Sequence, residues 1–320
     1  MPNYNGVWSL TTQFQYADTW NADNPNPVQG LFFGNNSATN VIQFLDLATT
    51  GNAADFGDLT TVTTSSSACA STTRAVRGGG NTGSNGTNTI DYVTFFSAGN
   101  ATDFGDLNVT MHEGTGTGSN TRGIFAGGAD SGGTALDRIE YITIANTGNG
   151  TDFGNLTSAK KQLYSFSSPT RSCFLGEASQ TTDIEYITID STGNATDFGD
   201  LTVATSLGGG CSSNTRGLSG GGYQSNGQAV NVISYVTIAS TGNASDFGDL
   251  TEIRFSIAGT SSETKGIFFG GEGDGANLGA GAVNTIDSVT IASTGNATDF
   301  GDALVVTRAA SATSSAHGGL

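Results

Sequence analysis

The sequence predicts an all-β fold, a six-bladed β-propeller of four-stranded antiparallel blades, on three observations. First, a phrase such as STGNATDFGDLT occurs six times in 320 residues, at steps of 48, 49, 45, 49 and 53 residues. Second, each period contains four short strand-like stretches, and third, the two chain ends supply complementary parts of one period. Periods of roughly 40 to 50 residues with four strands are typical of propeller blades. The phenylalanines of the six phrases are Phe56, Phe104, Phe153, Phe198, Phe247 and Phe300.

Within one period we expect four strands in the order A, B, C and D. Strand A is rich in small residues, as in VATSLGGGC, and strand B ends in glycines, as in TRGLSGGG. Strand C, as in IEYITIA, combines β-branched and aromatic residues, which is typical of a strand. The Gly-Asn pair of STGNAT indicates a hairpin turn, because both residues tolerate positive φ cheaply, and TDFGDL then forms strand D.

The composition of strand A supports the same geometry independently. Its copies are almost all Ser, Thr, Gly and Ala, and KQLYSFSSP is the bulkiest. The innermost strands of a propeller converge on the axis, where only small side chains fit. We therefore expect a narrow and chemically plain axis.

The two chain ends complete the count of blades. Before Thr60 lie VQGLFFG, NVIQFLDLA and AADFGDL, which match strands B, C and D, and after Phe300 the chain matches only strand A. The C-terminal strand should therefore complete the N-terminal blade and close the ring without an open edge. This division predicts a propeller over residues 27–320 and a separate docking or clasp segment over residues 1–26.

The repeat resembles the kelch family, whose blades carry a Gly pair after strand B, a Tyr in strand C and an aromatic residue in strand D. The resemblance runs from about Pro27 to the C-terminus. It departs from the family in one respect, because Phe of DFGDL stands where kelch repeats usually have Trp. The resemblance implies blade geometry and no particular activity. Two copies of the matching residues are Gly127, Gly128, Tyr141 and Phe153, and Gly221, Gly222, Tyr235 and Phe247.

Composition and charge exclude several classes of protein. The net charge is -17, with only 11 Lys and Arg residues, so the chain should repel nucleic acid, whose binding requires clustered basic residues. No apolar run approaches the length of a membrane span, and MPNYNGVWSLTTQ does not resemble a signal peptide. Cys69 and Cys211 occupy equivalent positions three repeats apart, too distant for a disulfide, and Cys173 has no partner. We expect three buried free thiols.

Only one connection of the repeat varies in length. The distance from the C-strand aromatic position to Phe of DFG is always twelve residues, and that from Leu of DFGDL to the basic residue of strand B is always fifteen. The stretch from strand B to strand C varies from 15 to 23 residues. Because variable loops on a rigid scaffold often carry binding, the B–C loops form the predicted ligand-binding face, with neutral drift of solvated loops as the alternative. The candidate residues are Asn35, Asn36, Asn81, Asn85, Asp130, Tyr223, Asn226, Glu272 and Asp274.

The opposite face carries a uniform basic position at the start of strand B. We interpret it as structural, forming a recurrent hydrogen bond to the Asp of TDFGD within or between blades, with a ligand role as the alternative. The phrase loops could also form a set of calcium sites, but the EF-hand spacing and its bidentate Glu are absent. The basic residues are Arg74, Arg122, Arg171, Arg216 and Lys265.

The motifs of several enzyme classes are missing. DFG occurs without the other protein-kinase motifs, and neither GxSxG nor a sialidase box is present. His112 and His317 are the only histidines, and neither belongs to a Cys/His cluster with metal-ligand spacing. The sequence therefore predicts a protein that is not an enzyme, with no cofactor and no metal.

The N-terminal segment holds both tryptophans, Trp8 and Trp20, which we assign to assembly. Its GVWSL phrase, together with the TGNATDFGDLT repeats, resembles virion and tail-fibre proteins of marine bacteriophages. The resemblance implies a virion protein that contacts other virion subunits in an oligomeric assembly and uses its propeller to bind a host-surface glycan or protein. The alternatives are a purely structural decoration or stabilising subunit of the virion and, less favoured, a bacterial surface lectin.

Overall fold

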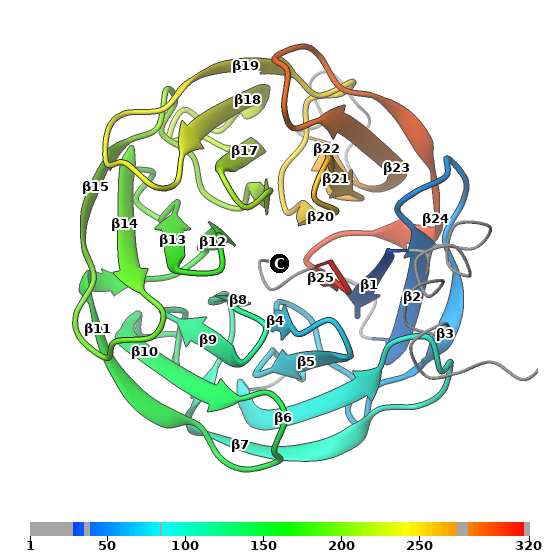
Figure 1. Cartoon of the computed structure of the whole chain (residues 1–320), viewed down its shortest axis with the longest axis vertical. Coiled ribbons are helices and arrows are strands. Elements are labelled where there is room, and N and C mark those ends of the chain that lie inside the picture. The colour runs from blue at the N-terminus through cyan, green and yellow to red at the C-terminus, as the bar shows by residue number, and fades with distance from the viewer. Residues whose placement is uncertain (1–27, 35–38, 84, 274–280, 317–320) are drawn as a thin grey trace, which may run out of the picture.

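The computed structural model describes residues 28–34, 39–83, 85–273 and 281–316. Figure 1 shows six sheets arranged around a central axis, and no helix occurs among the described residues. The predicted all-β, six-bladed propeller with four-stranded antiparallel blades is confirmed. Segment 1–26 and its residues Trp8 and Trp20 lie outside the described part of the chain.

The first blade combines the two ends of the chain, as predicted. Strand β25 (Ser311–Ser314) is the innermost strand and pairs antiparallel with β1 (Gln29–Phe33). Strand β1 in turn pairs with β2 (Val41–Asp46), and β2 pairs with β3 (Ala54–Asp58) at the outer edge. The ring is thus closed by hydrogen bonds between the C-terminal strand and the N-terminal blade.

The other five blades follow in chain order, each from the axis outward. Blade 2 contains β4 (Ser67–Ala70), β5 (Arg74–Gly78), β6 (Thr87–Thr94) and β7 (Thr102–Met111). Blade 3 contains β8 (Thr115–Gly118), β9 (Arg122–Ala126), β10 (Leu136–Thr143) and β11 (Thr151–Lys160). Blade 4 contains β12 (Tyr164–Ser167), β13 (Arg171–Leu175), β14 (Asp183–Thr188) and β15 (Thr196–Asp200).

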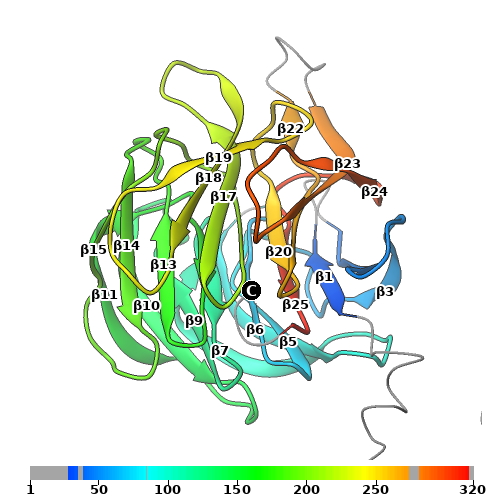
Figure 2. The same cartoon turned by 45° about the horizontal axis from the view of Figure 1, so that its top comes forward.

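The last two blades carry longer strands near their B–C loops. Blade 5 contains β16 (Gly209–Ser212), β17 (Arg216–Tyr223), β18 (Ala229–Thr237) and β19 (Ser245–Asp249). Blade 6 contains β20 (Ala258–Ser261), β21 (Lys265–Phe269), β23 (Gly281–Thr290) and β24 (Thr298–Thr307), and the short β22 (Glu272–Gly273) pairs with β23. Figure 2 shows the yellow-green β17–β18 hairpin extending beyond the ring.

The hydrophobic core is divided among the six interfaces between neighbouring blades. Between blades 1 and 2, for example, Leu31 and Phe56 pack in one cluster with Ala75 and Val93. Strand B is buried along almost its whole length in every blade, because it lies between strands A and C and under the neighbouring blades. The three cysteines are free and buried in these interfaces, as expected.

Candidate functional site

The repeat phrase connects each blade to the next along the outer edge of the ring. In blade 1, Phe56 O accepts a hydrogen bond from Gly99 N at 2.8 Å, and Asp58 O accepts one from Ala101 N at 2.7 Å. The side chain of Asn100 completes the contact, because its Oδ1 accepts a hydrogen bond from Asp58 N at 3.1 Å. The same three bonds recur at all six interfaces. The phrase therefore covers the edge of strand D, which would otherwise expose unpaired backbone groups.

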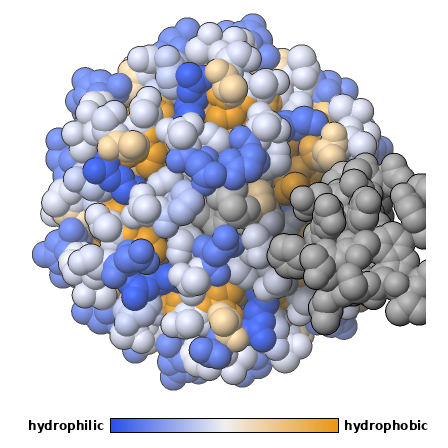
Figure 3. All heavy atoms as spheres, in the orientation of Figure 1, coloured by the Kyte–Doolittle hydropathy of each residue, from blue (hydrophilic) through white to orange (hydrophobic). Residues whose placement is uncertain are grey.

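The basic residues of strand B form a different contact from the predicted one. Figure 3 views the ring from the face of the A–B and C–D turns, hereafter the turn face, where hydrophilic residues are spaced around the ring with apolar residues between them. The guanidinium of Arg74 lies over the ring of Tyr92, 4.7 Å from its centroid, and donates to Ile144 O of the next blade at 3.1 Å. Arg122, Arg171 and Arg216 repeat this arrangement.

The predicted hydrogen bond between these basic residues and the Asp of TDFGD was therefore wrong. No ion pair of the described residues joins them, because the first Asp of each phrase is exposed at the outer edge, whereas the guanidinium lies over the tyrosine ring of strand C. In blade 6, Ser288 replaces the tyrosine, and Lys265 Nζ instead lies 4.9 Å from the Phe300 ring. The residue at the basic position therefore makes a cation–π contact and also donates a hydrogen bond to a backbone carbonyl of the next blade.

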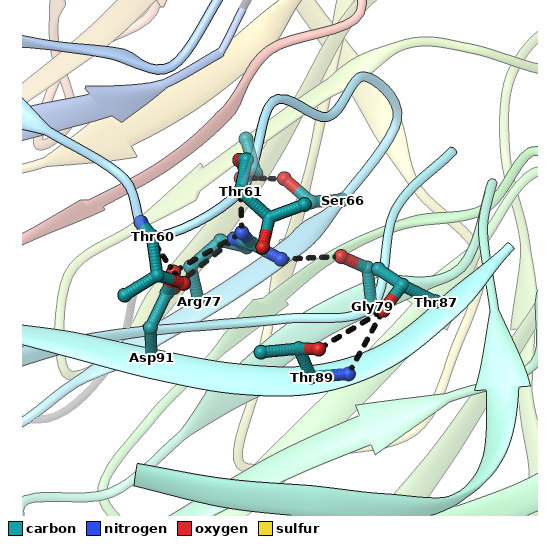
Figure 4. Close-up of polar contacts among 9 residues, drawn as sticks. Thr60, Thr61, Ser66, Arg77, Gly79, Thr87, Thr89 and Asp91 are labelled. Carbon is teal, nitrogen blue, oxygen red and sulfur yellow. Dashed lines mark hydrogen bonds and ion pairs between the residues drawn. The ribbon is translucent and has the colours of Figure 1, made fainter. Parts of the chain in front are cut away.

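A second connection between blades involves a position that sequence reasoning missed. It is the residue before the C-strand aromatic position, and it is buried in every blade. In blade 2 it is Asp91, whose carboxylate accepts hydrogen bonds from the backbone and hydroxyl of Thr60 and pairs with Arg77 Nε at 3.1 Å (Figure 4). Burial lowers the pKa of the Arg77 guanidinium, and the charge of Asp91 partly offsets this effect. The signal in the sequence was a single polar residue within an apolar strand: Gln43, Asp91, Glu140, Glu185, Ser234 and Asp287.

The six A strands line a narrow central channel with a cavity of about 80 Å³. Three blades carry glycine at one position of this strand, and a Cβ atom there would lie 2.0 to 2.3 Å from backbone oxygens of the neighbouring A strand. Those glycines are Gly116, Gly210 and Gly259. The expected restriction to small residues therefore has a steric cause. The larger Tyr164 is buried, and its hydroxyl lies 2.9 Å from Thr205 Oγ1.

One end of the channel is surrounded by a closed ring of backbone hydrogen bonds. It lies on the face of the B–C and D–A connections, hereafter the loop face, and consists of one residue per blade, two positions before the start of strand A. Each residue has a positive φ of 51° to 64° and donates its N–H to the carbonyl of the equivalent residue one blade earlier, at 2.7 to 3.2 Å. We call these residues the mouth ring: Ser65, Glu113, Gln162, Leu207, Ser256 and Ala309.

Around the mouth ring lie two sets of equivalent positions that face each other. The first set precedes the mouth ring in sequence and consists of Thr64, His112, Lys161, Ser206, Phe255 and Arg308. The second set lies at the end of strand B or three residues after it and includes Asn81, Ala129, Ala178, Tyr223 and Glu272. In four blades the two sets are joined by an antiparallel bridge, as in Thr64 with Asn81. We call the two sets together the rim.

The rim differs chemically from blade to blade, although its backbone frame recurs. It includes aromatic, basic, acidic, amide, hydroxyl and alanine side chains. Of the 11 Lys and Arg residues, three are buried in ion pairs, five lie at the turn face and Arg138 pairs with Glu140. The remaining two, Lys161 and Arg308, both belong to the rim. The rim is therefore where a repeating frame presents side chains that do not repeat.

Three of the predicted binding residues belong to the rim, and the others do not. Asn81, Tyr223 and Glu272 occupy the same repeat position. Asp130 and Asn226 lie farther out and use their Oδ1 atoms to accept backbone hydrogen bonds within their own loops. The exposed Asn85 contacts its own loop through its backbone. Asn35, Asn36 and Asp274 lie outside the described residues.

Tyr223 and Glu272 belong to a cluster that spans blades 5, 6 and 1. The half-buried rings of Tyr223 and Phe255 contact each other, with centroids 4.9 Å apart and an interplanar angle of 49°. Phe255 and Glu272 exchange two backbone hydrogen bonds, and Glu272 forms an ion pair with Arg308. Sequence reasoning missed Phe255 and Arg308 because both lie in D–A connections of constant length.

The described residues contain no group of three or more His, Cys, Asp or Glu side chains placed to hold a metal ion. Within the same residues, no helix has the length and apolar character needed to cross a membrane. No model of a known protein family matches the chain, and no curated protein matches it.

Proposed function

We propose that this chain is a non-enzymatic bacteriophage virion protein, a tail fibre or tail-associated subunit of the kelch-like propeller type, and that its loop face attaches to the host surface. The virion assignment rests on the resemblance carried by GVWSL and the TGNATDFGDLT phrases. The attachment role rests on the rim.

The observation that carries the attachment role is the contrast between the two faces. On the turn face, four blades repeat the same contact of an arginine with a strand-C tyrosine, and blade 6 places Lys265 over the Phe300 ring. At the mouth of the channel, the same backbone frame presents aromatic, basic and acidic groups in different blades. Differences that the frame does not require are typical of a surface that contacts a ligand.

Adsorption of phage particles tests this function. Particles that lack the protein should bind host cells much more slowly than complete particles, and purified chain should compete with complete particles for the cells. Immunogold labelling should place the protein on the tail or its fibres. Normal adsorption of particles that lack the protein would contradict the attachment role.

A structural role in the virion is the second candidate, and one observation favours it. Leu304, Val305 and Val306 of β24 are 50%, 43% and 55% exposed, although three successive exposed apolar residues are unusual outside a contact surface. The equivalent residues of blade 3, in β11, are Thr157, Ser158 and Ala159.

Exchanging the two sequences separates the candidates. The variant Leu304→Thr, Val305→Ser, Val306→Ala should fold normally, since blade 3 carries these three residues at the equivalent positions of β11. If the chain is a packing subunit, the variant should fail to enter particles. Normal incorporation of the variant would count against the structural role.

A further inference from the structure

The pair of aromatic rings at the rim is not required by the fold. The bridge between Ser206 and Tyr223 and the bridge between Phe255 and Glu272 have the same form as that between Thr64 and Asn81 in blade 2. Blade 2 thus builds this frame with a hydroxyl and an amide side chain. An aromatic pair that the backbone does not need is partly exposed at the mouth of the channel.

Polar groups border the two rings on both sides. Glu272 and Arg308 form their ion pair beside Phe255, and the side-chain amide of Gln180 reaches Ser206 Oγ at 3.5 Å. The hydroxyl of Tyr223 is not hydrogen-bonded to any described residue, although Gly227 lies close to it. The cluster thus combines an apolar surface with hydrogen-bonding groups at its edges.

This combination fits a sugar ring. One face of a pyranose presents C–H groups that pack on an aromatic ring, while its hydroxyl groups lie at the edge and require hydrogen-bond partners. The charge of the site favours a neutral sugar, because the charge of Arg308 is balanced by Glu272 and the whole chain carries a net charge of -17. An anionic saccharide would be repelled by this field.

We propose that Tyr223 and Phe255, with Glu272 and Arg308, form a subsite for one neutral hexose or N-acetylhexosamine unit of a cell-surface glycan. This proposal rests on the proposed function, since it names the ligand of the loop face. The aromatic rings supply the packing surface, and the ion pair and the tyrosine hydroxyl supply hydrogen bonds to the sugar hydroxyls.

The test uses the purified full chain and a panel of oligosaccharides. The panel contains neutral oligomers of glucose, galactose, mannose and N-acetylglucosamine, together with matched oligomers that contain uronic acids. Binding is measured by calorimetry at up to millimolar sugar. We expect binding to at least one neutral oligomer and weaker or no binding to its anionic counterpart.

The decisive variant is Tyr223→Asn with Phe255→Thr, which installs the residues that blade 2 carries at the same positions. It should unfold at the wild-type temperature and bind the neutral oligomer about tenfold more weakly or worse. The matched control is Phe96→Asn, which changes an exposed aromatic residue of a C–D turn on the turn face, outside the rim, and should leave sugar binding unchanged.

Three outcomes would overturn the subsite: no neutral oligomer binds, anionic oligomers bind better, or the folded double variant binds as well as wild type. Binding to host cells separates this failure from failure of the proposed function. If the chain binds cells through a protease-sensitive receptor but binds no sugar, attachment stands and the saccharide assignment fails. If the chain binds neither cells nor sugar, both fail.

Discussion

At the scale of single residues, the polar position of strand C shows how this fold contains buried charge. Asp91 is buried with Arg77, and the two residues face each other across β5 and β6. Blade 5 carries Ser219 and Ser234 at the same paired positions. The frame therefore accepts either a buried ion pair or two hydroxyls, but an isolated buried charge has no compensation.

A double-mutant cycle measures this dependence. Asp91→Ser should lower the free energy of unfolding by about 3 to 5 kcal/mol, because it leaves the Arg77 guanidinium buried without its partner. Adding Arg77→Ser should restore part of that loss, because the variant then matches blade 5. Urea unfolding of the four proteins gives the coupling energy, and strictly additive losses would contradict the prediction.

The buried thiols make stability depend on alkaline pH. Burial raises the pKa of Cys69, Cys173 and Cys211, whereas thiols of the unfolded chain have a pKa of about 8.5. Below pH of about 8.5 the thiols are protonated in both states, and the free energy of unfolding is at its full value. Above it only the unfolded chain loses these protons, so the free energy of unfolding falls by about 1.4 kcal/mol per thiol and pH unit. Urea midpoints at neutral and alkaline pH measure the loss. A triple Cys→Ala variant should show a flatter pH dependence, and equal slopes would refute the assignment.

At the scale of strands, the outer and inner edges of each blade are fixed by different means. The outer edge is covered by the turn of the next repeat phrase, through backbone bonds and an asparagine side chain. At the inner edge, serine hydroxyls at the end of strand A donate to the carbonyl of the preceding blade, as in Ser212 to Ser167 O at 2.6 Å. Ser167, Ser261 and Ser314 form equivalent bonds.

The glycine of the DFGD phrase is essential to the outer contact. Gly57 has a φ of 152°, and a Cβ atom there would lie 2.2 Å from Gly99 O. Gly57→Ala should lower stability by about 2 to 4 kcal/mol, because the neighbouring turn would have to move away. Gly148→Ala is the control: it changes a turn glycine with open space around it and should cost less than about 0.5 kcal/mol. Thermal unfolding compares the two, and similar losses would contradict the argument.

One further hydroxyl bond between neighbouring A strands can be added at the inner edge. Ala70 occupies the position of the donating serines in blade 2, and Ala70→Ser should place its hydroxyl near Ser314 O. The gain should be about 0.5 to 1.5 kcal/mol in the free energy of unfolding. Gly118→Ser in blade 3 should instead destabilise, because a Cβ atom there would lie 2.2 Å from Arg122 O. Denaturant unfolding that ranks the two variants in the reverse order would refute this.

The sequence was sufficient to predict the strands and the ring, because the period, the constant spacings and the complementary ends all concern the backbone frame. It was not sufficient for side-chain direction. Spacing placed Arg74 and the phrase Asp at the same end of the blade, yet one lies on a tyrosine ring and the other in solvent. The spacing of the repeats also did not predict the contact between Phe255 and Tyr223. Phe255 lies in a D–A connection of constant length and Tyr223 at a B–C connection of variable length, and the two belong to neighbouring blades.

At the scale of the whole molecule, closure of the ring by β25 connects the last blade to the first. Its residues pair with Gly30 to Phe33 of β1, and Ala312 belongs to the core cluster between blades 6 and 1. The mouth ring closes at the same place, since Ser65 N donates to Ala309 O at 2.9 Å. Loss of β25 would therefore expose the edge of β1, disrupt the core cluster between blades 6 and 1, and weaken the closure of the mouth ring.

Truncation before the closing strand tests this cooperation. A chain ending at Ala309 should lose its cooperative unfolding transition or associate through the exposed edge of β1, because unpaired strand edges template pairing with other chains. A synthetic peptide of residues 310–320 should restore the monomer and raise the unfolding midpoint, since it supplies the missing strand. A chain ending at Ala316 keeps β25 and should behave as the full chain. Light scattering and thermal unfolding follow both effects, and a monomeric truncated chain with an unchanged midpoint would show that the ring is stable without its closing strand.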